Sequence, residues 1–81
     1  MSIATIEITE SINARGMACP GPLMALIGAI RRSDVGSVFE VLSSDEGSKT
    51  DIPAWVAKAK HELVEVVPED GYARFIVRKT H

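Results

Sequence analysis

Residues 19–36, CPGPLMALIGAIRRSDVG, carry a helix start, an apolar stripe and a helix end in one uninterrupted stretch. Proline lacks an N–H and fits only the first turn of a helix, so Pro20 and Pro22 place the start beside Cys19. Apolar residues then recur at the i, i+3, i+4 and i+7 spacing of a buried helix face. They are Leu23, Leu26, Ile27 and Ile30. The stretch therefore predicts one helix packed on a core, with the chain's only cysteine at its start.

Two strands are predicted on either side of this helix. Residues 5–14 alternate apolar and polar side chains, which is the period of a strand with one buried face. Residues 37–43, SVFEVLS, follow the helix and predict the second strand. A strand–helix–strand unit crosses over with a right hand, so these two strands are expected to be parallel.

The C-terminal half predicts a second helix and a hairpin. The helix is expected over residues 51–63, with Pro53 in its first turn and Thr50 or Asp51 as the N-cap. Residues 62–68 and 72–79 predict two strands joined by a turn.

The order of elements, β-α-β-α-β-β, sets the fold class. The final hairpin makes the sheet mixed, and two helices are too few to cover both faces of it. We therefore predict a single α+β domain over residues 1–81. It is a two-layer sandwich in which a mixed four-stranded sheet carries both helices on one face.

Composition narrows the function classes. The net charge is -2 with no long basic block, which argues against nucleic-acid binding because that requires many phosphate contacts. The N-terminus lacks the basic and apolar regions of a secretory signal, and the longest apolar run is too short to cross a bilayer. We expect a cytoplasmic protein with a reduced thiol and no membrane partner.

Cys19 is the candidate nucleophile. The first turn of a helix has unpaired N–H groups and a partial positive charge, which stabilise a thiolate. A residue before proline favours extended angles, so the sulfur is expected near the helix end, facing the N–H groups of Gly21 and Leu23. Arg15 is expected to add positive charge. The alternative is a buried thiol that only fills the core.

A lone thiol fits some chemistries better than others. With one cysteine the chain has neither a dithiol redox centre nor a resolving partner. Cys19, His61 and His81 lack the spacing of metal ligands, and His61 lies in the predicted helix rather than beside the thiol as a base. A single exposed thiolate suits a carrier that accepts a group from one protein and passes it to another.

The stretch INARGMACPGPL resembles the signature of the TusA-like (SirA-like) sulfur carrier proteins. The matching positions are Asn13, Arg15, Gly16, Cys19, Pro20 and Pro22. Downstream, SDEGSKTDIPAWVAKAKHEL is similar to the family's acidic loop and second helix, and YARFIVRK to its last strand. The resemblance covers roughly residues 11–80, and it implies the same β-α-β-α-β-β sandwich.

The resemblance also implies the activity. Cys19 would become a persulfide, with sulfur supplied by a cysteine desulfurase or a rhodanese-like donor and passed to a reactive cysteine of an acceptor relay protein (DsrE-like or similar). No cofactor or metal is implied beyond the covalent persulfide. Known family routes lead to tRNA thiolation, molybdenum cofactor maturation and sulfur oxidation.

Other residues are assigned supporting roles. Arg15, Gly16, Pro20, Gly21 and Pro22 are expected to shape the thiol site. A partner-docking surface is expected at Asp45, Lys49, Thr50 and Asp51, because the family's equivalent loop lies near the thiol. Two departures from the family pattern are Asn13, where an Asp is usual, and Glu46-Gly47, where Asp-Pro is usual.

Two other functions remain open on the sequence alone. One is a regulatory or interaction module in which the thiol is incidental, so that partner binding survives loss of Cys19. The other is a thiol redox sensor, which would accumulate a sulfenate or a mixed disulfide instead of a persulfide.

Overall fold

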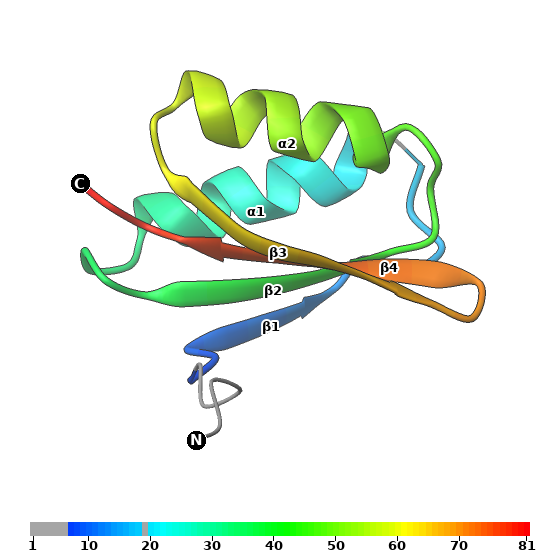
Figure 1. Ribbon diagram of the computed structural model, residues 1–81, viewed down its shortest axis with the longest axis horizontal. Coiled ribbons are helices and arrows are strands. Elements are labelled where there is room, and N and C mark those ends of the chain that lie inside the picture. Colours follow the sequence, from blue (N-terminus) through cyan, green and yellow to red (C-terminus); the bar gives the residue numbers. More distant parts are fainter. Residues whose placement is uncertain (1–6, 19) are drawn as a thin grey trace.

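A computed structural model describes residues 7–18 and 20–81, and its two layers are evident in Figure 1. Both helices lie side by side on the same face of a four-stranded sheet, as predicted. The elements are β1 (Glu10–Asn13), α1 (Gly21–Arg31), β2 (Val38–Ser43), α2 (Ser48–Lys58), β3 (Glu62–Glu69) and β4 (Tyr72–Arg78). No helix within the described ranges is long and apolar enough to span a bilayer.

The sheet has the strand order β1-β2-β4-β3 and is mixed, which confirms the predicted fold class. β1 pairs with β2 in parallel, and both other pairings are antiparallel. The first strand is shorter than predicted. It begins at Glu10, although the backbone N–H of Thr9 still donates to the carbonyl of Val38 at 2.7 Å. The first two residues of the predicted strand, 5 and 6, lie outside the described residues.

The core lies between the sheet and the helices. β4 places Ala73, Phe75 and Val77 toward the helices, and α1 contributes Leu26, Ala29 and Ile30. Further buried members are Ala14, Phe39, Val41, Ile52 and Val56. Apolar side chains on alternate positions of β2 and β4 and on one stripe of each helix thus form the core, and Ile12 of β1 and Leu63 of β3 pack against it.

Helix α2 differs from its prediction at its start. The sequence suggested Thr50 or Asp51 as the N-cap, but this is wrong, because the helix already begins at Ser48 and its N-cap is Gly47. The preceding loop winds directly into the helix. The N–H groups of Ser48 and Lys49 donate to carbonyls three residues back. Pro53 consequently lies inside the helix rather than in its first turn.

Helix α2 also ends earlier than residue 63. The N–H of Lys60 donates to the carbonyl of Ala57 (3.1 Å) and that of His61 to the carbonyl of Val56 (3.0 Å). This is the paired hydrogen-bond pattern of a Schellman end, which requires a left-handed residue between helix and strand. Lys60 occupies that position with φ of 64°, a conformation that favours glycine over residues with a Cβ.

Replacing Lys60 with Gly is therefore expected to stabilise the protein. Glycine removes a left-handed strain of about 1 kcal/mol, part of which is offset by the greater freedom of glycine in the unfolded chain. We expect a net gain of about 0.5 kcal/mol in the free energy of unfolding, measured by chemical denaturation. Lys60→Ala is the matched control. It keeps the Cβ, so a gain of the same size in that variant would contradict the explanation.

The face of the sheet opposite the helices carries a polar network across the strands. Glu40 of β2 accepts a hydrogen bond from Ser11 of β1 at 2.8 Å and from Arg74 of β4 at 2.6 Å. Arg74 also reaches Glu69 of β3 at 3.5 Å. Burial alone would raise the pKa of Glu40, but the hydrogen bonds from Ser11 and Arg74 and the positive charge of Arg74 outweigh it. The pKa of Glu40 therefore lies below its ordinary value.

This shift predicts how stability depends on pH. A carboxyl group with a lowered pKa in the folded state stabilises the fold fully above its unfolded pKa, about 4.3 for Glu. The contribution is lost as the pH falls through the lower folded pKa. Glu40→Gln should be less stable than wild type at pH 7 and should show a weaker loss of stability on acidification. Unfolding curves measured across the acid range test this, and parallel acid limbs for the two proteins would contradict it.

Candidate functional site

The N-termini of both helices lie at one end of the molecule, together with the end of β1 and the loop before α2 (Figure 1). The connecting segment, residues 14–20, joins β1 to α1 there. Cys19, the predicted nucleophile, lies outside the described residues, whereas its neighbours Ala18 and Pro20 are described and exposed. Helix α1 begins at Gly21, two residues after Cys19, as the prolines predicted.

The first residues of the connecting segment are anchored to β2 and to the loop before α2. Ala14 is fully buried, and its N–H donates to the carbonyl of Leu42 at 2.8 Å, which continues the pairing of β1 with β2. Gly16 has φ of +89°, a conformation that residues with a Cβ rarely adopt. Its N–H donates to Oγ of Ser44 at 3.0 Å, which ties the segment to the loop before α2. This hydrogen bond could not be predicted from the sequence, because Ser44 is 28 positions from Gly16.

The start of α1 is held by packing and backbone hydrogen bonds. Pro20 is the N-cap and provides no side-chain cap, and Pro22 in the first turn is fully buried. The N–H of Gly21 donates to the carbonyl of Ala18 at 2.8 Å. This donor is therefore engaged within the segment, contrary to the expectation that it faces the sulfur. Gly21 also lies against Met17, whose Cβ would be 3.2 Å from an added Cβ.

Arg15 has a defined position on the opposite side of the sheet from the helices. Its Nε donates to Oδ1 of Asn13 at 3.0 Å, and its guanidinium carbon lies 4.8 Å from the centre of the Tyr72 ring. Tyr72 alternates along β4 with the core residues Ala73 and Phe75, so its ring belongs to the helix-free face. Asn13, which stands where the family usually has Asp, thus accepts a hydrogen bond that orients Arg15 without neutralising its charge.

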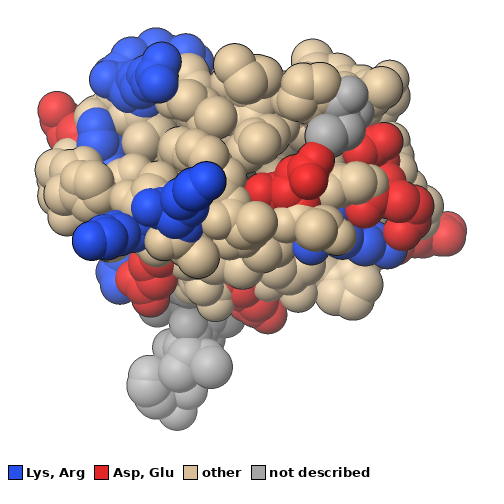
Figure 2. Space-filling view, turned by 90° about the horizontal axis from the view of Figure 1, so that it is seen from above, with Lys and Arg blue, Asp and Glu red and all other residues tan. Residues whose placement is uncertain are grey.

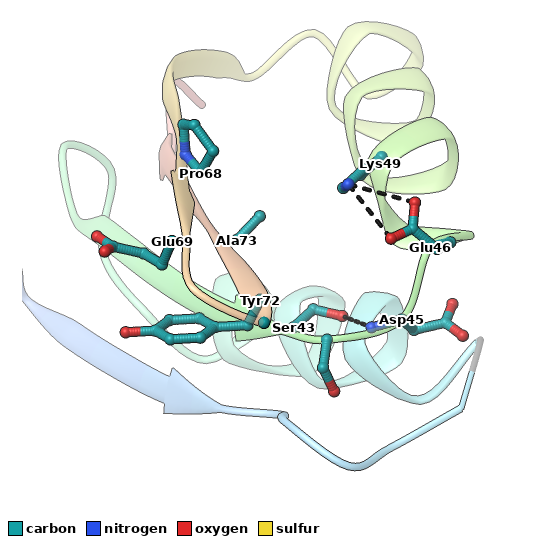
Figure 3. Close-up of a pocket in the computed structure, with 10 residues that line it drawn as sticks. Ser43, Asp45, Glu46, Lys49, Pro68, Glu69, Tyr72 and Ala73 are labelled. Carbon is teal, nitrogen blue, oxygen red and sulfur yellow. Dashed lines mark hydrogen bonds and ion pairs between the residues drawn. The ribbon is translucent and has the colours of Figure 1, made fainter.

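A shallow pocket of about 200 Å³ lies beside this segment, between the loop before α2 and the turn of the β3–β4 hairpin. In Figure 3 the ion pair of Lys49 and Glu46 forms one wall, and Pro68 and Glu69 stand opposite. The carboxylate of Asp45 points away from the hollow. The pocket is also lined by Ser43, Ser44, Gly71, Tyr72 and Ala73.

The predicted docking residues are thus brought together at this end, in and beside the loop before α2. Asp45 and Lys49 line the pocket, and Thr50 and Asp51 belong to the first turn of α2. Ser43, at the end of β2, holds this loop in place. Its buried hydroxyl hydrogen-bonds to the hydroxyl of Ser48 at 2.8 Å and accepts a hydrogen bond from the backbone N–H of Asp45 at 3.2 Å. Oδ2 of Asp45 is buried without a hydrogen-bond partner among the described residues.

Charge is distributed unevenly over the helical face. Figure 2 shows most acidic side chains on the right, the end of the helix N-termini, and basic side chains mainly on the left. At this end the loop before α2 carries Asp45 and Glu46. Among the residues with described placement, no three His, Cys, Asp or Glu side chains lie close enough to hold a metal ion.

Comparisons with known proteins agree on one family. The family model described as "Sulfurtransferase TusA" matches residues 10–79. A relative in Archaeoglobus fulgidus is 57% identical over 68 residues, covering 84% of this chain and 93% of the relative. The "Sulfur carrier protein TusA" of Pseudomonas aeruginosa is 32% identical over 75 residues, which is 93% of this chain and 95% of that protein.

A solved structure supports the fold independently. The crystal structure of a SirA-like protein from Desulfitobacterium hafniense superposes with a TM-score of 0.78. The match covers 89% of this chain and 99% of that one, at 20% sequence identity. It confirms the predicted sandwich architecture.

Proposed function

Because the chain belongs to the TusA family of sulfur carrier proteins, we propose that Cys19 carries sulfur as a persulfide. The Cys19 thiolate attacks the terminal sulfur of a donor's cysteine persulfide. A new S–S bond forms on Cys19 as the donor's S–S bond breaks, and the donor leaves as a thiolate. The same exchange then passes the sulfur to an acceptor thiolate. Both steps are balanced, so no cofactor, oxidant or reductant is required.

The observation that carries this proposal is the place of the only cysteine. Cys19 directly precedes Pro20, the N-cap of α1, within the residues that match the family. The N-terminal end of a helix favours a negative charge, which supports a thiolate or persulfide anion there. The well-anchored residues on both sides, Gly16 and Pro22, provide a fixed frame for the reactive residue.

Membership of a sulfur carrier family implies a sulfur donor and a sulfur acceptor. The donor is a cysteine desulfurase or a rhodanese-like protein, and the acceptor is a relay protein that presents a reactive cysteine. The exchange takes place in the cytoplasm, where thiols remain reduced. The sulfur would serve tRNA thiolation, cofactor sulfuration or sulfur oxidation.

Intact mass spectrometry tests the proposal. The purified protein is incubated with inorganic polysulfide, and its mass is recorded before and after treatment with a reducing agent. We expect a gain of one sulfur that reduction removes, and no gain in protein whose thiol was first alkylated. An irreversible gain would indicate sulfinic acid, and the absence of a reversible adduct would refute the carrier chemistry.

A further inference from the structure

Arg15 differs from the other arginines on the helix-free face of the sheet. Arg74 forms ion pairs with Glu40 and Glu69, and Arg78 forms one with Glu62. Arg15 has no carboxylate partner among the residues that the structure describes, since its side chain contacts an amide and an aromatic ring. Its positive charge is therefore oriented but not neutralised.

The orientation of Arg15 is fixed from two sides. Asn13 accepts the Nε–H at 3.0 Å and also the backbone N–H of Arg15 at 3.3 Å. The guanidinium carbon lies over the ring of Tyr72, 4.8 Å from its centre, which is a favourable cation–π distance. A planar guanidinium held in this way keeps its terminal N–H groups available for a bidentate contact with a carboxylate. Less side-chain freedom is then lost on binding.

Arg15 lies within reach of any protein that exchanges sulfur with Cys19. Four residues span at most about 14 Å of chain, whatever path they take. A standard interface covers about 800 Å² on each partner, which corresponds to a patch about 16 Å in radius. An interface of this size that is centred on Cys19 would therefore include Arg15.

Building on the proposed function, we propose that Arg15 is a docking anchor for a carboxylate side chain of the sulfur donor protein, next to the donor's persulfide cysteine. The surroundings favour a single carboxylate over a polyanion. The same end carries Asp45, Glu46 and Glu69, and binding of a nucleic acid requires several cations together. Because a single charge pair contributes mainly to orientation, Arg15 fixes how the donor approaches rather than attracting it from a distance.

The test compares sulfur loading from a protein and from a small molecule. Second-order loading rates are measured by intact mass with two protein donors, a cysteine desulfurase supplied with L-cysteine and a rhodanese loaded from thiosulfate. Each rate is divided by the rate with inorganic polysulfide, which reports the reactivity of the thiol itself. We expect this ratio to fall about tenfold in Arg15→Gln, mainly through a higher KM.

Two further variants sharpen the test. Arg31→Gln removes the same charge from an exposed arginine in the last turn of α1, at the opposite end of the helix, and should leave the ratio unchanged. Asn13→Asp places an internal carboxylate against Arg15 and should lower the ratio as Arg15→Gln does. Thermal unfolding of each variant checks that the fold is retained.

The outcomes separate this inference from the proposed function. Equal ratios in wild type and Arg15→Gln, or equal losses in Arg15→Gln and Arg31→Gln, would overturn the role of Arg15. So would a wild-type protein that polysulfide loads but neither protein donor loads. If polysulfide itself leaves no reversible sulfur on Cys19, it is the carrier function that fails.

Discussion

Cys19→Ser will abolish sulfur loading from every donor while the protein stays folded. A serine hydroxyl is a far weaker nucleophile than a thiolate at neutral pH and forms no persulfide, so no reversible gain of sulfur should be detected. The expected loss is complete, below the detection limit of intact mass spectrometry. It is the largest functional effect that we expect from any single substitution.

The fold should tolerate this change because α1 is held by other residues. Pro22, Leu26, Ala29 and Ile30 anchor the helix in the core, and its N-cap is Pro20 rather than residue 19. We expect the free energy of unfolding to change by less than about 1 kcal/mol, as is usual outside the core. A variant that unfolds would instead favour a structural thiol. Retention of reversible sulfur in a folded variant would place the reactive group elsewhere.

Much of the fold could be predicted because its signals are local. The prolines and the 3.6-residue apolar spacing marked the start and the buried face of α1, and Gly71 marked the hairpin turn, where it takes φ of +84°. From the order of strands and helices it then followed that both helices cover the same face of the small sheet. The structure confirms this fold class.

The boundaries of α2 could not be predicted from propensity. The loop before it winds into the helix through backbone hydrogen bonds, so the N-cap is Gly47 and the side chains of Thr50 and Asp51 have no capping role at that position. At the other end, two hydrogen bonds of the Schellman pattern force Lys60 into a left-handed conformation that its residue type disfavours. The first and last residues of α2 are therefore set by the hydrogen bonds at its two ends rather than by the propensities of its residues.

In the candidate site, too, local features could be predicted and contacts between distant residues could not. The place of Cys19 before a helix follows from sequence, whereas the surroundings of Arg15 do not. Tyr72 and Arg15 are 57 positions apart and meet because the start of β4 and the end of β1 lie at the same end of the molecule. The positive charge of Arg15 near the thiol could be predicted from the sequence, whereas its contacts with this ring and with Asn13 could not.

Phe75→Ala will destabilise the protein more than any surface substitution. Phe75 is fully buried in the middle of β4, where it is paired with Val41 of β2 and Val66 of β3. Removing a buried phenylalanine side chain costs about 3–5 kcal/mol, because apolar contacts are lost and a cavity remains. A domain of this size is stable by only about 4–12 kcal/mol in total. We therefore expect the substitution to remove a large part of the total stability and to lower the unfolding midpoint markedly.

Phe75→Leu provides the matched control, because it keeps an apolar side chain and should cost about 1 kcal/mol. Urea denaturation of all three proteins, followed through the fluorescence of Trp55, which packs against the core, gives the free energies directly. A loss below about 1 kcal/mol in Phe75→Ala would mean that the core closes around the cavity. Since the helices rest on this core, loading by a protein donor should fall with the folded fraction of Phe75→Ala. The unfolded chain still presents a thiol to polysulfide, so the loss should be smaller with that donor.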